Sequence, residues 1–299
     1  MTNVAVGARI TLKNVLYLTD FSEPSESALP FAISVAREYG AKVYAFHVLI
    51  PAIYTYTTPE LTAAALEAQD EAAQLNMQRV EAQLSGLSHE SILVRGTGIW
   101  PPSERAIKDY AIDLIVLGTH GRTGAQKLLL GSVAEEVFRR SHVPVLTIGP
   151  AEHGGAHNAA KFHRVLFATD FTGESLAAAP YAVSMAQENE AHLVLLHVMK
   201  EPETVPTDRA AEDAMSSALS QLYEIVPAAA ELWCKPEAVV QFGNPAEQIL
   251  KVAREHGADL IVLGVRHPRG FIGAATHLER TTAHKVVVHA NCPVLTVRG

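Results

Sequence analysis

The chain has 299 residues, of which 48% are hydrophobic and 19% charged, and its formal net charge is −8. This composition fills proper cores, and the length is natural for two domains. An acidic balance without a Lys/Arg run argues against a nucleic-acid partner, and two cysteines exclude a disulfide scaffold. No apolar run approaches a membrane span and no secretory segment is recognised, so we expect a soluble, cytoplasmic protein without membrane contact.

The first half of the chain opens with a strand predicted over residues 13–19. Ser22 follows as a helix N-cap, and apolar residues then recur at helical spacing until Gly40 ends the helix. A second strand is predicted over Lys42–Leu49. This alternation of strand and helix is typical of a parallel α/β sheet.

The rest of this half continues the alternation. A long helix is predicted from about Pro59 to Leu84, a strand over Ser91–Arg95, and a short helix after Pro102. The run that starts at Asp113 is an unbroken apolar strand ending at Gly118, as expected for a strand buried on both faces. The remaining elements are a helix from Ser132 and a closing strand over Val143–Ile148.

The second half of the chain repeats the first. Val15–Ser22 matches Val165–Thr172 at a shift of 150, and Asp113–Gly118 matches Asp259–Gly264 at a shift of 146. Residues 151–160, rich in Gly, Ala, Asn and His, indicate a linker. We therefore expect domains at residues 1–150 and 161–299, joined by 151–160.

Five strands with helical crossovers in each half predict two tandem, doubly wound parallel five-stranded sheets of flavodoxin-like order. Ligands bind such sheets beyond the carboxyl ends of the strands, where the strand order reverses. Thr19 and Asp20 would then share one crevice with the loop after Gly118. A carboxylate at Asp20 suits a ribose or a metal near phosphates, but Asp is equally common as a helix cap, and the residues alone leave both open.

The loop between Gly118 and Ser132 is the strongest functional signal. A strand, a glycine-rich loop and a helix N-terminus together favour an anion, and Arg122 and Lys127 lie within reach of its oxygens. The spacing is G-x2-G-x9-G-S, through Gly121 to Gly131 and Ser132, and it differs from the Walker A and Rossmann patterns. This signature resembles that of the ATP-binding members of the universal stress protein family.

The resemblance covers both halves and implies an adenine-nucleotide α-hydrolase-like fold that binds ATP together with Mg. In the family, the acidic residue after the first strand contacts the nucleotide, which favours the ligand role for Asp20. Val48 matches the residue that packs on adenine, although its position equally suits the core. The residues expected at the nucleotide are Thr19, Asp20, Val48, Leu117, Gly118, Gly121, Arg122, Lys127, Gly131, Ser132 and Val133.

The second half departs from this signature. Aligned without gaps from Gly264, it places His267 at the second glycine and His277-Leu278 at the Gly-Ser pair. We therefore expect a degenerate nucleotide motif in the second domain.

The expected function is that of an ATP-binding, stress-response regulatory protein, with the nucleotide held by the first domain. The family also implies a homodimer and an unidentified protein partner. The alternative is a slow ATPase or nucleotidyl-transfer enzyme of the same α/β class, and a pure dimerisation scaffold is a third reading. The sequence shows no general base or nucleophile, and no catalytic or metal-ligating residue is assigned.

Overall fold

The computed structural model describes residues 9–51, 59–119, 130–149, 161–201, 208–228, 236–266 and 281–299. They form two compact units, residues 11–149 and residues 161–299, and Arg9 and Ile10 belong to the second unit. Arg9 contacts it through an ion pair with Glu188, with 2.7 Å between guanidinium and carboxylate. The proposed linker, 151–160, lies outside the described residues.

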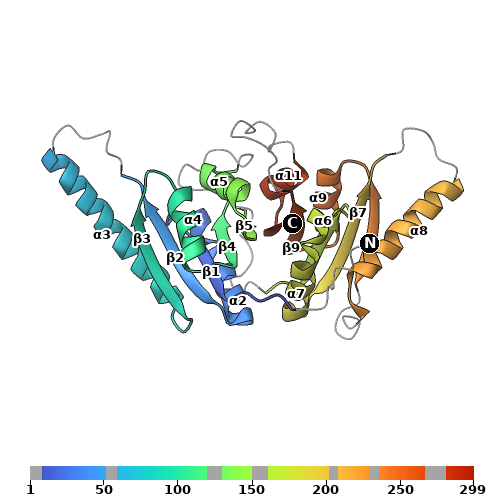
Figure 1. Ribbon diagram of the computed structural model, residues 1–299, viewed down its shortest axis with the longest axis horizontal. Helices are drawn as coiled ribbons and strands as arrows, with labels where there is room; N and C mark the ends of the chain where they lie inside the picture. The colour runs from blue at the N-terminus through green and yellow to red at the C-terminus, as the bar shows by residue number, and fades with distance from the viewer. Residues whose placement is uncertain are drawn as a thin grey trace. The chain divides into compact units, whose positions relative to one another are not determined.

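The first unit alternates strands and helices (Figure 1). The predicted strand Lys42–Leu49 and the predicted helix start at Ser132 are confirmed, whereas the closing strand begins at Val145 and not at Val143. The elements are β1 (Asn14–Leu18), α1 (Glu23–Glu26), α2 (Leu29–Tyr39), β2 (Lys42–Leu49), α3 (Pro59–Gln83), β3 (His89–Arg95), α4 (Trp100–Asp109), β4 (Leu114–Gly118), α5 (Ser132–Arg140) and β5 (Val145–Ile148).

The second unit repeats this order. Its elements are β6 (Arg164–Thr169), α6 (Gly173–Leu176), α7 (Ala179–Asn189), β7 (His192–Met199), α8 (Asp208–Ile225), β8 (Glu237–Phe242), α9 (Pro245–Glu255), β9 (Leu260–Val265), α11 (Thr282–His289) and β10 (Val294–Arg298). Among the described helices of both units, none combines the length and the apolar character needed to cross a lipid bilayer.

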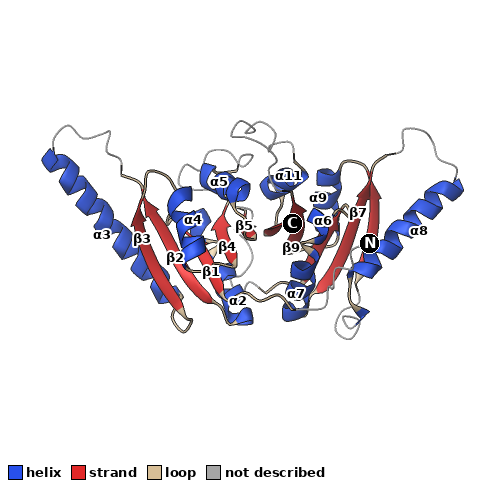
Figure 2. Ribbon diagram, viewed as in Figure 1, coloured by secondary structure: helices blue, strands red, loops and turns tan. Residues whose placement is uncertain are grey.

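Each unit has a parallel sheet of five described strands, flanked by helices (Figure 2). The order is β3-β2-β1-β4-β5 in the first unit and β8-β7-β6-β9-β10 in the second. The strand order reverses between β1 and β4, where Leu18 lies beside Leu117, and between β6 and β9, where Ala168 lies beside Leu263. The predicted doubly wound parallel α/β class is confirmed, and each unit has a switch point at which a ligand crevice is expected.

The central strands are buried because their apolar runs are covered on both faces of the sheet. Leu114, Ile115 and Val116 of β4 are 0% exposed, as are Val15 and Leu16 of β1. The neighbouring helix α2 ends where the sequence predicted, since Gly40 takes the left-handed conformation with φ of 67°.

One aspartate in each unit fastens the amino ends of the two central strands. The Asp113 Oδ2 accepts hydrogen bonds from the backbone N–H groups of Lys13 and Asn14, at 2.7 and 2.9 Å. Asp259 accepts the corresponding bonds from His163 and Arg164, also at 2.7 and 2.9 Å. These bonds hold the two central strands of each unit side by side, so the loops that follow their carboxyl ends lie next to each other.

Candidate functional site

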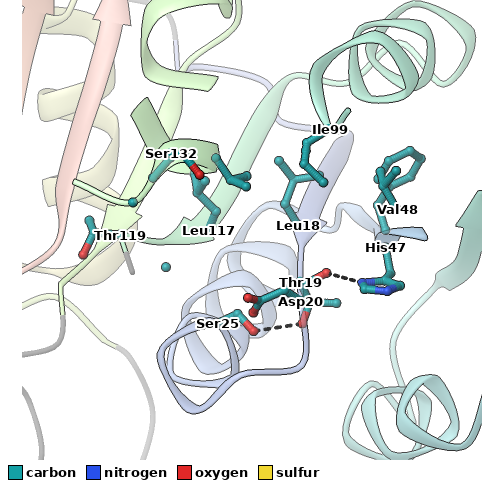
Figure 3. A pocket seen from close by; sticks show the side chains of 15 residues that line it. Leu18, Thr19, Asp20, Ser25, His47, Val48, Ile99, Leu117, Thr119 and Ser132 are labelled. Atoms are coloured by element: carbon teal, nitrogen blue, oxygen red, sulfur yellow. Dashed lines mark hydrogen bonds between the residues drawn. The ribbon is translucent and has the colours of Figure 1, made fainter. Parts of the chain in front are cut away.

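The first unit has a cavity of about 250 Å³ at the carboxyl ends of β1, β2 and β4 (Figure 3). It lies at the switch point that the strand order predicts. Eight of the residues expected at the nucleotide line it: Thr19, Asp20, Val48, Leu117, Gly118, Gly131, Ser132 and Val133. The other three, Gly121, Arg122 and Lys127, lie outside the described residues.

The cavity also has lining residues that the sequence analysis missed: Leu18, Ser25, Phe46, His47, Ile99, Thr119 and Ala134. Phe46 could have been predicted to line the cavity, because it lies two residues before Val48 and therefore on the same face of the strand. Ile99 lies between β3 and α4, so its contribution depends on how the loop after the third strand folds. Only the tertiary arrangement brings that loop to the cavity.

One side of the cavity is apolar. Leu18 and Leu117 come from the adjacent strands β1 and β4, and Figure 3 shows Ile99 and Val48 beside them. Val48 is 6% exposed and Leu117 is 3% exposed. Val48 is therefore a buried residue that also faces the cavity, and this wall suits a flat apolar group such as a nucleobase.

The opposite side carries the carboxylate of Asp20. Its Oδ1 accepts hydrogen bonds from the backbone N–H of Ser22, at 3.0 Å, and from the Ser22 hydroxyl. Ser22 is itself the N-cap of α1, as predicted, and its Oγ accepts from the Ser25 N–H. The alternative in which Asp20 caps this helix is therefore wrong, because Asp20 orients the capping residue and points its carboxylate to the cavity (Figure 3).

A strained residue fixes the turn behind Asp20. Phe21 has φ of 60°, a left-handed conformation that costs a non-glycine residue about 1–2 kcal/mol. Its N–H donates to Thr19 Oγ1 at 3.0 Å, and its ring packs on the His47 imidazole with the centroids 4.4 Å apart. The His47 Nδ1 in turn lies 2.8 Å from the Thr19 carbonyl oxygen. Because a carbonyl oxygen only accepts, Nδ1 carries the proton of that bond.

The N-terminus of α5 forms a third side of the cavity. Gly131 is its N-cap, with φ of −60° and ψ of 147°, and no side chain of the described residues caps the helix. The Gly131 N–H donates to the Thr119 carbonyl at 2.7 Å, so the donors that face the cavity begin at Ser132 and Val133. An uncapped helix N-terminus presents N–H groups and the positive end of the helix dipole, and both favour an anion.

Gly118 has a packing role that the sequence did not indicate. A Cβ at this position would lie 2.3 Å from the Pro24 carbonyl oxygen and 3.2 Å from Ser25 Cα. The absence of a side chain lets α1, which follows the Asp20 turn, pack directly on the end of β4. Gly264 makes the corresponding approach in the second unit, 2.3 Å from the Glu174 carbonyl oxygen.

The second unit has a smaller cavity, of about 160 Å³, at the equivalent place. Its helix α11 has Thr281 as N-cap and Thr282 as first residue, four positions beyond the place that the ungapped alignment assigned. Counted back from the closing strands, where Val145 and Val294 occupy the same register, Ser132 corresponds to Thr281, and the ungapped alignment with His277-Leu278 was wrong. His267, His277 and Leu278 themselves lie outside the described residues.

Two domains, each with a doubly wound parallel sheet and a cavity at its switch point, define a tandem α/β protein with two candidate ligand sites. The model of the universal stress protein family matches residues 11–149 and 161–298, and the chain belongs to that family. The family resemblance stated from the sequence is confirmed, and the two matches agree with a tandem arrangement.

Whole-length relatives support the same assignment. A universal stress protein of Mycolicibacterium smegmatis is 26% identical over 296 residues, covering 95% of this chain and 96% of its own. The crystal structure of a universal stress protein from Archaeoglobus fulgidus covers 97% of each chain at 23% identity, with a TM-score of 0.67. A universal stress protein solved in complex with cAMP covers 46% of this chain at 21% identity, with a TM-score of 0.35.

Proposed function

We propose that the first unit binds ATP and that the chain is an ATP-responsive regulatory protein of the stress response. The observation that carries this proposal is the joining of three features in one cavity. An apolar wall lies beside a fixed carboxylate, and both lie beside a helix N-terminus that no described side chain caps. A nucleotide combines a flat base, a hydroxylated sugar and an anionic chain in the same way.

Each part of ATP has a counterpart in the cavity. The adenine packs against Val48, Ile99 and Leu117. The ribose hydroxyls donate to the Asp20 carboxylate, and the phosphates accept from the N–H groups at the start of α5. Ser132 adds a hydroxyl donor. The glycine-loop residues Gly121, Arg122 and Lys127 complete the phosphate end of this proposal on the strength of the sequence signature alone.

Mg²⁺ belongs to the proposal as the counter-ion of the phosphates. Within the described part of the chain, no group of three or more His, Cys, Asp or Glu side chains is placed to hold a metal. Mg²⁺ prefers phosphate oxygens and waters as ligands, which leaves Asp20 to the ribose. Bound to the phosphates, the ion would neutralise their charge.

The remaining features of the proposal follow from the family resemblance. The protein acts in the cytoplasm as a homodimer, and its ATP-bound and ATP-free states differ in their affinity for a protein partner. The nucleotide acts as a signal and is not consumed. In this reading the second unit has a structural or regulatory role and does not bind ATP.

The test is a calorimetric titration of the full chain with ATP and Mg²⁺. We expect one ATP per chain. Asp20→Asn preserves the shape of the turn but removes the charge, and it should weaken binding about tenfold, the cost of one charge-assisted hydrogen bond. The matched control is Asp170→Asn in the second unit, which should leave ATP affinity unchanged.

Three outcomes would contradict the proposal. Two equivalent ATP sites per chain, or undiminished binding by Asp20→Asn, would refute the assignment of the site. Sustained ADP release well above the blank would instead refute the regulatory reading and support the slow ATPase.

A further inference from the structure

The turn Asp170–Thr172 in the second unit has the same hydrogen bonds as the turn Asp20–Ser22 in the first. Asp170 Oδ1 accepts from the Thr172 N–H at 3.1 Å and from the Thr172 hydroxyl at 2.6 Å. Phe171 has φ of 61°, and its ring packs on His197 with the centroids 4.4 Å apart. The unit therefore retains a strained turn that directs a carboxylate into a cavity, and this strain is conserved between the two copies in the same chain.

The phosphate end of the cavity, in contrast, is changed. The Thr281 hydroxyl accepts from the His284 N–H at 3.2 Å, so α11 has a side-chain cap, whereas no described side chain caps α5. A capped N-terminus is a weaker anion site, because one of its donors is already satisfied. The cavity is also smaller, about 160 Å³ against about 250 Å³ in the first unit. Both differences disfavour a nucleoside triphosphate.

The second unit has instead a guanidinium beside its carboxylate. Arg266 follows β9, lines the cavity, and has its Nη2 3.7 Å from Asp170 Oδ2. Arg298, at the end of β10, donates to the Arg266 carbonyl oxygen at 2.8 Å and so holds the backbone of this residue. By sheet register the first unit has Gly149 at the place of Arg298. Among the described residues that line the first cavity, none is a lysine or an arginine.

The charged pair lies over an apolar wall. Leu196, Val198, Ile249 and Leu263 line the same cavity as Asp170 and Arg266. The two charged side chains are 58% and 67% exposed, and an ion pair of such exposure is worth little, so a ligand with both charges replaces it at small cost. Partial burial raises the pKa of Asp170, but hydrogen bonds from Thr172 and Ser175, together with the charge of Arg266, outweigh it and lower the pKa. The carboxyl group therefore stays ionised near neutral pH.

We propose that the cavity of the second unit binds an apolar α-amino acid of about the size of leucine. Its ammonium group pairs with Asp170, its carboxylate with Arg266, and its side chain packs against the apolar wall. One carbon atom separates the two charges of an α-amino acid, so they lie as close together as the two protein groups that face them. A fatty acid or an aliphatic amine supplies one of these charges and leaves the other protein group without a ligand partner.

The experiment titrates the full chain with leucine and follows both the heat of binding and the melting temperature. The comparison ligands are isoamylamine, 4-methylpentanoate and AMP, which supply the amine alone, the carboxylate alone, and a nucleotide. We expect binding of leucine but not of isoamylamine or 4-methylpentanoate at equal concentration, and we expect AMP not to displace leucine. Asp170→Asn and Arg266→Gln should each weaken leucine binding about tenfold or more, since each removes a charge-assisted pairing.

Asp20→Asn is the matched control, because it makes the same change in the first unit, and it should bind leucine as the wild type does. A failure of ATP binding would leave these expectations unchanged, so the two proposals are tested separately. The proposal is overturned if leucine does not bind, if AMP displaces it, or if leucine binding survives either Asp170→Asn or Arg266→Gln. Melting of the unliganded variants at the wild-type temperature shows that the fold is intact.

Discussion

Replacing Gly118 by alanine tests how the first cavity is built, because it adds one methyl group where β4 meets the turn that carries Asp20. The new Cβ would lie 2.3 Å from the Pro24 carbonyl oxygen and 2.8 Å from the Pro24 carbonyl carbon. Optimal contact between carbon atoms is about 3.5–4.0 Å, and the obstructing atoms are backbone atoms that cannot rotate away. The start of α1 must therefore move away from the sheet.

The expected cost is that of an overpacked core, about 1–3 kcal/mol. In a unit of this size, that cost lowers the melting temperature by about 2–12 °C. Displacement of α1 also moves Asp20 relative to α5, so ATP affinity should fall together with stability. Differential scanning calorimetry measures the first effect, and a titration with ATP below the new melting temperature measures the second.

Two variants serve as controls for Gly118→Ala. Gly264→Ala places a Cβ 2.3 Å from the Glu174 carbonyl oxygen, so it should destabilise the second unit and leave ATP affinity unchanged. Gly98→Ala meets no atom within 4 Å and should change neither property. If Gly118→Ala melts and binds ATP like the wild type, the close approach of β4 and α1 does not set the position of Asp20.

Two further predictions concern the helix cap and the acid limb of stability. Gly131→Thr gives α5 the cap that α11 already has, in a backbone conformation that suits threonine, since Thr281 has φ of −74° and ψ of 146°. The ATP affinity of this variant should fall about tenfold without loss of stability. The control variant Thr281→Gly should leave ATP affinity unchanged. If calorimetric titration shows that Gly131→Thr binds ATP as tightly as the wild type, the phosphate assignment is contradicted. The pKa of Asp170 is lowered from 3.8 in the folded state, so its contribution is present above that pH and lost as the pH falls through the folded value. The stability difference between wild type and Asp170→Asn should therefore be constant above about pH 5 and shrink in more acidic solution, as followed by urea unfolding; a constant difference at all pH values would contradict the lowered pKa.

The elements with strong periodicity or clear end signals were predictable from the sequence. The strand Lys42–Leu49, the helix end at Gly40 and the helix start at Ser132 all follow from apolar runs, glycine and capping residues. The proximity of Asp20 and Gly118 was also predictable, because the switch point of a doubly wound sheet is set by topology alone.

The remaining parts of the site depend on distances that no pattern encodes. The start of α11 at Thr282 was misplaced because the alignment assumed a loop of constant length, and loop length is not constrained by the periodicity of the flanking elements. Ile99 and His47 face the cavity through the meeting of separate loops and strands. The clash that Gly118 avoids involves a carbonyl oxygen of Pro24, far from it in sequence. Such contacts become visible only when the chain is folded.

The turn at Phe21 is repeated at Phe171, so the two units of one chain can be compared directly. Both copies have the same left-handed residue, the same ring contact and nearly the same hydrogen-bond lengths, while the groups around the opening of each cavity differ. Both units therefore retain the strained turn that directs an aspartate into the cavity. They differ in a few residues at the helix cap and the strand ends, and these residues would determine which ligand each cavity binds. A change of specificity in either unit therefore requires only local substitutions. The unchanged unit then serves as an internal control, because it is measured in the same chain and the same solution.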